Sequence, residues 1–287
     1  STCQRLNRMA ESSSKQDHFV GVDLGGTKIL AGVFSHNLKC LGRAKVSTKA
    51  QRGPEAVIGR IARCVRDAVD ECDLDLKKVK GVGVGAPGPV DLQSKPQSMV
   101  GIFIGTGIGA GLIINGKLYS GFNRTAGEIG HMILEVGGPK CSCGNRGCFE
   151  ALASRQALFR KIKDAVKEGQ KTNLTEILDD ELTDMRSGDL RKAIRRGDKY
   201  LERVIEEAAE YIGIGVANVI NLLNPEVIVL GGGVIDALAD EMMAIIVETA
   251  QDYALSGTAK GIEIIASKVG DDAGIVGGAV LARRETK

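Results

Sequence analysis

The sequence predicts an α/β protein built from two lobes. Apolar, strand-like runs alternate with amphipathic helical runs along the chain, which is the order that layered α/β folds produce. A strand–turn–strand pattern occurs twice, 80 residues apart, at 20–34 and 100–114. A segment rich in cysteine and glycine, 141–148, interrupts the second half. These three observations indicate two lobes of one duplicated design, with a small loop inserted in the second.

The composition is that of a globular protein in a reducing compartment. The 287 residues are 43% hydrophobic, which is enough for a large core, and the net charge of +2 with 3% aromatics does not indicate nucleic-acid binding. The longest apolar stretch, 99–114, contains five glycines and is too short to span a membrane. Residues 1–17 are polar and lack the apolar core of a signal peptide, so we expect a disordered or tag-like tail and a cytoplasmic protein. Seven cysteines, an odd number, then favour free thiols.

The N-terminal lobe is expected over 18–98 and begins with the first strand–turn–strand. An apolar run, 19–23, ends in the carboxylate of Asp23 and is followed by the turn Leu24–Lys28 and a return strand at 29–34. Glycines let a backbone approach a ligand closely, and amides with a threonine hydroxyl and a lysine suit phosphate oxygens. A single motif of this kind can also be an ordinary hairpin turn. The second occurrence of the motif, at Gly105–Gly109, is what favours phosphate binding. We therefore expect a nucleotide with one glycine turn on each side of its phosphates.

A helix and a further strand complete this lobe. Pro54 starts a helix whose apolar stripe runs over 57–72, and the strand 79–86 follows it. The turn Gly85–Asp91 contains two prolines and ends in a carboxylate. At the end of a strand such a turn suits a ligand, and it can equally be a tight turn alone.

The C-terminal lobe is expected over 99–287. After the second hairpin, Ser154 caps a helix that ends at Gly169, and a long helix runs from Asp198 to Asn224. The strand 226–230 then leads into three glycines whose flat backbone suits an adenine or ribose. A strand at 262–269 and a helix at 275–283 close the chain, and we expect this last helix to pack on the N-terminal lobe. The three glycines are Gly231, Gly232 and Gly233.

Three cysteines and one histidine form a candidate zinc site within the segment 131–148. The four residues are His131, Cys141, Cys143 and Cys148. Thiolates and imidazole are the preferred ligands of a structural zinc, although three unligated cysteines in a reduced loop remain the alternative. Closing this loop should bring Glu128 and Glu150 toward one place, where carboxylates accept hydrogen bonds from sugar hydroxyls. The alternative for each glutamate is a solvated surface position.

The set of motifs resembles the ROK family of repressors, open reading frames and sugar kinases, which have an actin-like ATPase (ribonuclease H-like) fold. The resemblance covers nearly everything from His18 to Arg284 and rests on six segments in the family's order: 23–28, 85–91, 105–109, 126–131, 141–150 and 230–233. It implies an ATP-dependent kinase that phosphorylates a hexose or N-acetylhexosamine at the 6-hydroxyl, acting as a homodimer or higher homo-oligomer. ATP, Mg²⁺ and a structural Zn²⁺ are the implied cofactors.

The resemblance also implies roles for single residues. Asp23 would position magnesium and phosphates, and His131 would bind zinc through one ring nitrogen and sugar through the other. The implied nucleotide-binding residues are Gly25, Gly26, Thr27, Lys28, Gly105, Thr106, Gly107, Gly109, Gly231, Gly232 and Gly233. The implied sugar-binding residues are Gly88, Glu128, His131 and Glu150.

The chain departs from the family's pattern in one place. Sugar kinases of the family carry a strand and a helix after the proline-rich turn, with the aspartate that takes the proton from the sugar hydroxyl. Here only Leu92–Ser98 separates Asp91 from Met99, which is too short for such a unit. We expect that a stretch near 94–97 is omitted, because a genuine loss would remove a central sheet element. If the loss is genuine, a sugar-binding sensor is the alternative. A ROK-like transcriptional regulator is a further alternative, although 1–17 is too short for a DNA-binding helix-turn-helix.

Overall fold

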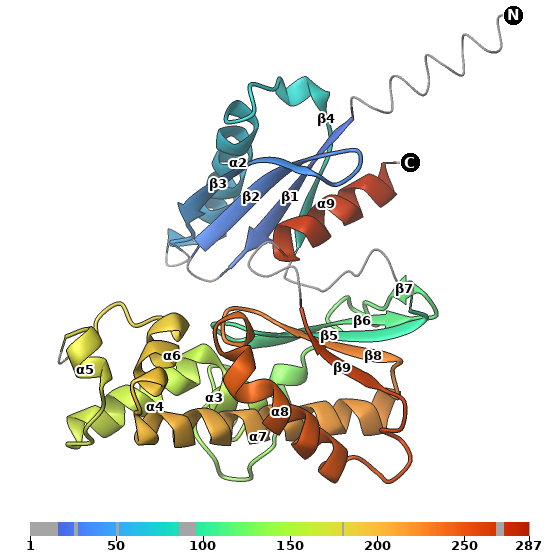
Figure 1. The fold of residues 1–287 in the computed structure, drawn as a ribbon. Coiled ribbons are helices and arrows are strands. Elements are labelled where there is room, and N and C mark those ends of the chain that lie inside the picture. The colour runs from blue at the N-terminus through green and yellow to red at the C-terminus, as the bar shows by residue number, and fades with distance from the viewer. Residues whose placement is uncertain are drawn as a thin grey trace, which may run out of the picture. The chain divides into compact units, whose positions relative to one another are not determined.

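The computed structural model describes residues 17–25, 28–49, 52–85, 96–179, 181–267 and 273–286. The chain divides into two compact units, and each contains one β-sheet with helices packed on it (Figure 1). Unit 1 consists of residues 1–90 and 272–287, and unit 2 consists of residues 91–271. The predicted α/β class is confirmed. None of the helices in the described ranges combines the length and the apolar character that a bilayer crossing requires.

Unit 1 has a four-stranded sheet in the order β3-β2-β1-β4. Its strands are β1 (His18–Leu24), β2 (Lys28–Ser35), β3 (Cys40–Ser47) and β4 (Val79–Gly85). The first two strands form the expected antiparallel hairpin, and β4 lies parallel to β1 with Gly85 beside Asp23. The carboxyl ends of β1 and β4 therefore lie next to each other at one edge of the sheet.

Helices cover both faces of this sheet: α2 (Pro54–Asp70) packs on one face and α9 (Ala273–Glu285) on the other. Side chains alternate between the faces of a strand, so Val20 and Val22 join the core under α2 while Phe19 packs with Ile275 of α9. Gly21 allows α9 to approach β1 backbone to backbone, because a Cβ at this position would lie 1.6 Å from the carbonyl oxygen of Ile275. A 3₁₀ turn, η2 (Leu76–Lys78), leads into β4.

Strand β4 has one apolar face without a helix among the described residues. Gly81 and Gly83 lie under α9, whereas Val82 and Val84, which point to the opposite face, are 47% and 45% exposed. Within the described ranges β4 pairs with β1 alone, so it forms an edge of the sheet. Parallel strands are normally buried on both faces, and an exposed apolar edge is unusual.

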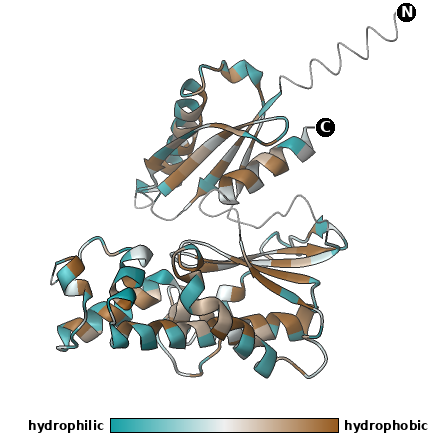
Figure 2. Ribbon diagram, in the orientation of Figure 1, coloured by the Kyte–Doolittle hydropathy of each residue, from teal (hydrophilic) through white to brown (hydrophobic). Residues whose placement is uncertain are grey.

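Unit 2 has a five-stranded sheet in the order β7-β6-β5-β8-β9. Its strands are β5 (Ser98–Ile104), β6 (Ile108–Ile114), β7 (Lys117–Leu118), β8 (Val227–Gly231) and β9 (Glu263–Ala266). The strands β5, β8 and β9 are parallel, so the loops that follow them emerge at the same edge. The hydrophobic colouring of these strands contrasts with the mixed colouring of the surface helices (Figure 2).

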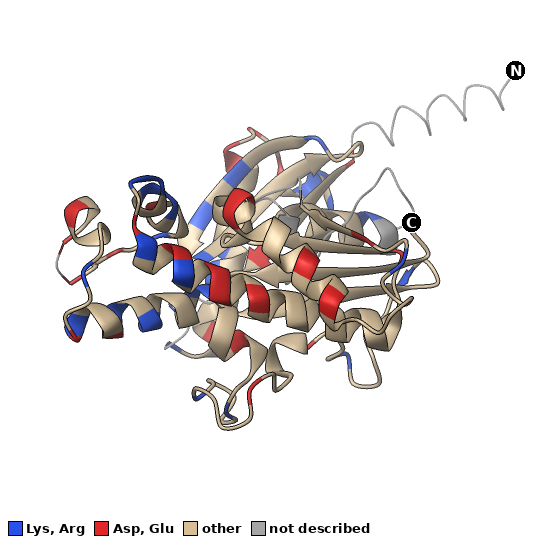
Figure 3. Ribbon diagram, turned by 60° about the horizontal axis from the view of Figure 1, so that its bottom comes forward, with Lys and Arg blue, Asp and Glu red and all other residues tan. Residues whose placement is uncertain are grey.

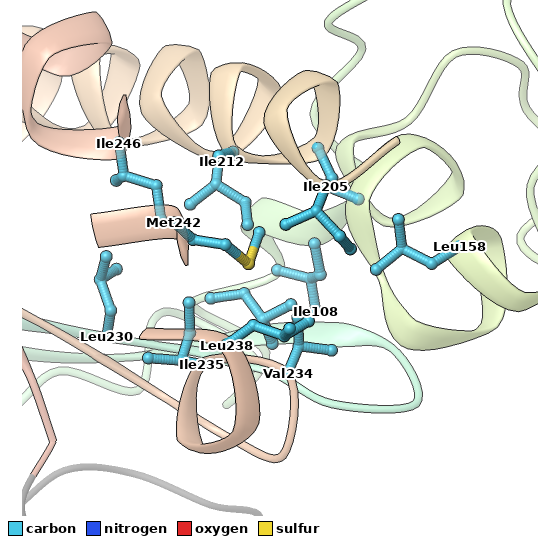
Figure 4. Close-up of a cluster of buried hydrophobic side chains, with 14 of the residues drawn as sticks. Ile108, Leu158, Ile205, Ile212, Leu230, Val234, Ile235, Leu238, Met242 and Ile246 are labelled. Atoms are coloured by element: carbon cyan, nitrogen blue, oxygen red, sulfur yellow. The ribbon is translucent and has the colours of Figure 1, made fainter. Parts of the chain in front are cut away.

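The helices of unit 2 are η3 (Ile129–His131), α3 (Phe149–Ala153), α4 (Arg155–Lys167), α5 (Leu174–Ile177), α6 (Ser187–Arg195), α7 (Lys199–Leu223) and α8 (Ile235–Tyr253). The core between the sheet and these helices includes Ile108, Leu158, Ile205, Ile212, Leu230, Leu238, Met242 and Ile246 (Figure 4). The longest helix, α7, begins at its expected cap, Asp198, whose carboxylate accepts hydrogen bonds from the backbone N–H groups of Tyr200 and Leu201. Basic and acidic residues occur on the same surface helices (Figure 3).

Two differences from the sequence-based expectation concern strands. Strand β3 was not predicted, because its alternating exposure and its arginine and lysine give only a weak apolar signal. Of the strand expected at 262–269, the structure has Glu263–Ala266, and residues 268–269 lie outside the described ranges. The helix α9 was expected at 275–283 and begins two residues earlier, at Ala273.

Candidate functional site

Three loops of unit 2 meet at the carboxyl ends of β5 and β8. We call them the loop cluster: the turn 105–107, the loop 231–234 and the start of α4 at Arg155. The N–H of Val234 donates to the carbonyl of Ile104 over 3.1 Å, and the N–H of Arg155 donates to the carbonyl of Gly105 over 2.9 Å. These bonds connect segments about 50 and 130 residues apart in the sequence. In α/β sheets this edge is the usual place for ligands.

There is open space beside two glycines that follow β5, Gly105 in the turn and Gly109 in β6. The N–H of Gly105 donates to the carbonyl of Gly107 over 2.9 Å and closes the turn. A Cβ placed on Gly105 or Gly109 would meet no other atom within 4 Å. At these two positions the backbone is therefore accessible from the side, as a phosphate-binding turn requires.

Glu150 links this turn to the cysteine loop. Its Oε2 accepts a hydrogen bond from the N–H of Ile108 over 3.0 Å, and its Oε1 accepts one from the hydroxyl of Ser142 over 3.2 Å. Gly107 leaves the room for this carboxylate, because a Cβ there would lie 2.2 Å from Oε2. The structure thus brings Glu150 to the turn after β5 and does not leave it as a solvated surface group.

The four predicted zinc ligands come together. The ligand atoms of His131, Cys141, Cys143 and Cys148 all lie within 4.8 Å of one another. The Sγ atoms of Cys143 and Cys148 are 3.7 Å apart, and so are the Sγ of Cys141 and the Nδ1 of His131. Zinc bond lengths of 2.0–2.3 Å with tetrahedral angles require ligand separations of about 3.4–3.8 Å. The donor set and the two separations of 3.7 Å therefore fit a structural zinc ion.

The thiols of this cluster differ in acidity. Burial and hydrogen bonds with Cys143 and Cys141 raise the pKa of the Cys148 thiol to about 12, whereas a hydrogen bond with the backbone of Asn145 lowers the pKa of Cys143. A buried thiol beside others resists ionisation unless a cation lies among them. A divalent metal ion would supply that charge.

The two ring nitrogens of His131 face different groups. Nδ1 faces Cys141 in the cluster, and Nε2 lies 3.8 Å from Oε2 of Glu128. The side chain of Glu128 is 67% exposed, so its carboxylate is accessible from outside. A carboxylate at the outer nitrogen orients a metal-binding imidazole.

In unit 1, Asp23 lies at the carboxyl end of β1, beside the start of α9. A Cβ on Gly274 would lie 2.7 Å from the Cβ and Cγ atoms of Asp23, so a glycine is needed there. The turn between β1 and β2 is closed by the N–H of Gly25, which donates to the carbonyl of Lys28 over 2.9 Å. The buried hydroxyl of Thr48 also donates to the carbonyl of Gly25 over 2.6 Å. The other predicted residues of this unit, Gly26, Thr27 and Gly88, lie outside the described residues.

Three residues at these sites were not singled out from the sequence. Arg155 follows the cap Ser154, and its Nη2 donates to the hydroxyl of Thr106 over 2.5 Å. Thr48 and Ser142 also reach their partners only through the fold. Of the three, Arg155 could most easily have been predicted from the sequence. A basic residue is unfavourable at the positive end of a helix, so its presence there indicates a role other than helix stabilisation.

The chain is similar to kinases along most of its length. It is 28% identical to a glucokinase of Halalkalibacterium halodurans, over 93% of this chain and 95% of that one. The chain is also similar to a solved structure, that of a ROK family glucokinase from Streptomyces griseus in complex with glucose and AMPPNP. The two are 27% identical and superpose with a TM-score of 0.80, over 93% of this chain and 99% of the glucokinase chain. A xylose repressor of Caldicellulosiruptor bescii is 39% identical, but over only 48% of this chain and 34% of the repressor.

The alignment with the Halalkalibacterium glucokinase is longer than the part of this chain that it covers. It spans 317 positions, whereas 93% of 287 residues is about 267, so about 50 positions face a gap in this chain. A unit of one strand and one helix with its connections fits within that number.

The ROK family model matches the chain in two parts, residues 19–96 and 91–285. The two parts meet at 91–96, which is where the sequence predicts the omitted strand and helix. Together they span nearly the whole region that carries the motifs, the two sheets and the loop cluster. The chain belongs to the ROK family.

Proposed function

We propose that this protein is an ATP-dependent sugar kinase that transfers a phosphoryl group to the 6-hydroxyl of a hexose or N-acetylhexosamine. The observation that carries the proposal is the position of Glu150, which connects the candidate zinc cluster to the glycine turn after β5. One carboxylate thereby couples the region assigned to sugar with the region assigned to phosphate. The similarity to glucokinases over more than nine tenths of both chains supports the same reaction class.

The nucleotide is assigned to glycine turns of both units. In unit 2, Gly105, Gly109 and the loop 231–233 would let the phosphates and the ribose approach the backbone closely. In unit 1, Asp23 would hold the magnesium ion, whose charge would offset that of the phosphates. Lys28 would neutralise further phosphate charge, and Gly25, Gly26 and Thr27 of the same turn would hold the phosphate chain.

The sugar is assigned to the side chains around the cysteine loop. Glu128, with its exposed carboxylate, and Glu150 would accept hydrogen bonds from sugar hydroxyls, and Gly88 would provide a close backbone approach. Zinc would be structural, since four protein ligands leave no open position for chemistry. Its role would be to hold His131 and Glu150 in fixed positions.

We also propose that the complete protein carries a strand and a helix beside β4. Three observations support this: the family match is broken at 91–96, about 50 alignment positions face no residue of this chain, and Val82 and Val84 form an uncovered apolar face. A strand paired with β4 and a helix over these valines would bury that face. The general base that accepts the proton of the sugar hydroxyl would belong to this unit.

Intact mass of the protein from its natural source tests the missing unit. The present chain has a mass of 30.3 kDa, and about 50 further residues would add about 5 kDa. A mass of 30.3 kDa would show that the loss is genuine. The sensor function would then be favoured, because loss of a general base costs about 10²–10⁴-fold in rate.

The activity is tested by coupled ADP release with glucose, N-acetylglucosamine, N-acetylmannosamine and fructose. We expect turnover with at least one sugar, and no ADP release in its absence beyond a slow background. Folded, zinc-loaded protein that turns over none of the four would contradict the kinase proposal. Sugar-dependent thermal stabilisation without ADP release would instead support the sensor. Light scattering of the same preparation tests the proposed homodimer or higher homo-oligomer.

A further inference from the structure

We propose that Arg155 is a phosphate-binding residue of the nucleotide site, which contacts the α- and β-phosphates from unit 2. This inference rests on the proposed kinase function and adds a charged group to a site otherwise assigned to backbone N–H groups. Arg155 is the first residue of α4, directly after the buried cap Ser154. Its backbone N–H donates to the carbonyl of Gly105, so the base of its side chain is held at the end of β5.

The side chain of Arg155 spans the two glycine loops. Its Nη2 donates to the hydroxyl of Thr106 in the turn after β5. Its Nη1 lies 3.7 Å from the point that a Cβ on Gly233 would occupy, in the loop after β8. The guanidinium group therefore lies between the loop assigned to the adenosine end and the turn assigned to the phosphate end of the same ligand.

The charge of Arg155 has no carboxylate partner among the residues that the structure describes. None of the ion pairs within those ranges involves Arg155. The nearby carboxylate of Glu150 bonds to the N–H of Ile108 and to Ser142. Of the five N–H donors of the guanidinium, one serves the neutral hydroxyl of Thr106. The remaining donors are suited to a group with several anionic oxygens.

A phosphate chain fits this position better than a carboxylate or a sugar. A guanidinium binds two phosphate oxygens at once, and its planar donors match their spacing. The glycines on both sides let a ligand approach the backbone, since Gly105 and Gly109 have open space at their Cβ positions. The α- and β-phosphates are the part of ATP that lies between adenosine and the terminal phosphate.

The alternative is that Arg155 serves only to hold the turn through Thr106. The two possibilities differ in which ligands are affected. A phosphate-binding arginine changes the affinity for ATP and ADP but not for adenosine, whereas a purely structural one changes all three together or none. Adenosine binding is therefore the readout that separates them.

The test is isothermal titration of ATP, ADP and adenosine into the full chain and into Arg155→Met, which keeps the length of the side chain and removes its charge. We expect ATP and ADP to bind about 10–100-fold more weakly, as for loss of a charged hydrogen-bonded contact, and adenosine to bind within twofold of the unsubstituted protein. Arg155→Lys should recover part of the loss, because one ammonium group cannot bridge both loops.

Arg160→Met is the matched control on the same helix. Its guanidinium donates to the carbonyl of Ala151 and it has no described contact with either glycine loop. Nucleotide binding should be unchanged in this variant. Equal ATP affinity of Arg155→Met and the unsubstituted protein, or a parallel loss for adenosine, would overturn the assignment of Arg155. No nucleotide binding by the unsubstituted protein would contradict the proposed function itself.

Discussion

The two hairpins of this protein share one strand–turn–strand pattern but are held in different ways. Among the described residues of unit 1, the turn between β1 and β2 is bonded through its own backbone, from Gly25 to Lys28, and through the neutral hydroxyl of Thr48. In unit 2 the turn between β5 and β6 is also closed by its own backbone, and two charged side chains bond to it in addition, the carboxylate of Glu150 and the guanidinium of Arg155. Both charged residues lie shortly after the cysteine loop in the chain, Glu150 in the first turn of α3 and Arg155 at the start of α4.

This difference shows how a duplicated motif acquires separate functions. Both hairpins have the same strand pairing, but the neighbouring element decides which side chains reach the turn. In unit 1 the neighbour is α9, which approaches β1 so closely that Gly21 is required. In unit 2 the neighbour is the cysteine loop, and Glu150 connects that loop to the turn after β5.

Removing the metal should have the largest effect and should be confined to unit 2. Cys143→Ser replaces an exposed thiol, so it costs little core packing, but it removes one of four ligands. We expect loss of bound zinc, a melting temperature lower by about 5–10 °C, and sugar affinity reduced at least tenfold, because Glu150 loses its support. Metal content, calorimetry and sugar titration measure these changes. Cys40→Ser in unit 1 is the control and should keep the zinc; zinc retained by Cys143→Ser would refute the cluster.

A methyl group at Gly21 should disturb unit 1 and leave the zinc cluster intact. Its Cβ would collide with the backbone carbonyl of Ile275, which cannot move without displacing α9. We expect Gly21→Ala to reduce the free energy of unfolding by about 2–4 kcal/mol, as measured by urea denaturation.

Gly59→Ala is the matched control in the same unit. Gly59 lies on the exposed side of α2 with open space at its Cβ position, so alanine should stabilise the helix by about 0.5–1 kcal/mol. If both substitutions cost the same, the close contact between β1 and α9 is not what holds unit 1 together.

A methyl group at Gly107 should break the link between the turn and the cysteine loop. It would displace the carboxylate of Glu150 and leave the N–H of Ile108 without its acceptor, at a cost of about 1–3 kcal/mol. Chemical denaturation measures the cost, and sugar titration shows whether the link matters for binding. Gly109→Ala, two residues along and in open space, should change the free energy of unfolding by less than about 0.5 kcal/mol. Equal effects of the two would argue against a specific role of Glu150.

Removing one hydroxyl at Thr48 should have the smallest effect. Thr48→Val keeps the shape of the side chain but leaves the carbonyl of Gly25 without this donor, and we expect a loss of about 1 kcal/mol in the free energy of unfolding. Phosphate affinity should change little, because the hydroxyl points to a carbonyl and not to the open side of the turn. If Thr48→Val lowered the free energy of unfolding more than Gly107→Ala does, side-chain contacts would matter more for the turn of unit 1 than for the turn of unit 2.

Much of the fold was predictable because its signals are local. The periodicity of α7, its cap Asp198 and its left-handed final residue Asn224 are all encoded within a few positions of one another. Strand β3 was missed for the complementary reason: half of its residues are exposed, and its place is decided by pairing with β2. The zinc ligands were predicted from residue type, and the structure brings all four together.

The sequence by itself determined the chemistry available to this protein: two glycine turns, four metal ligands of the right type, and two glutamates near them in the chain. Only the tertiary structure decided that Glu150 and Arg155 both reach the turn after β5, while Thr48 reaches the turn after β1. These contacts join residues 23 to 49 positions apart. A contact between such distant residues depends on how sheets and helices pack, and the local periodicity of the sequence does not predict that packing.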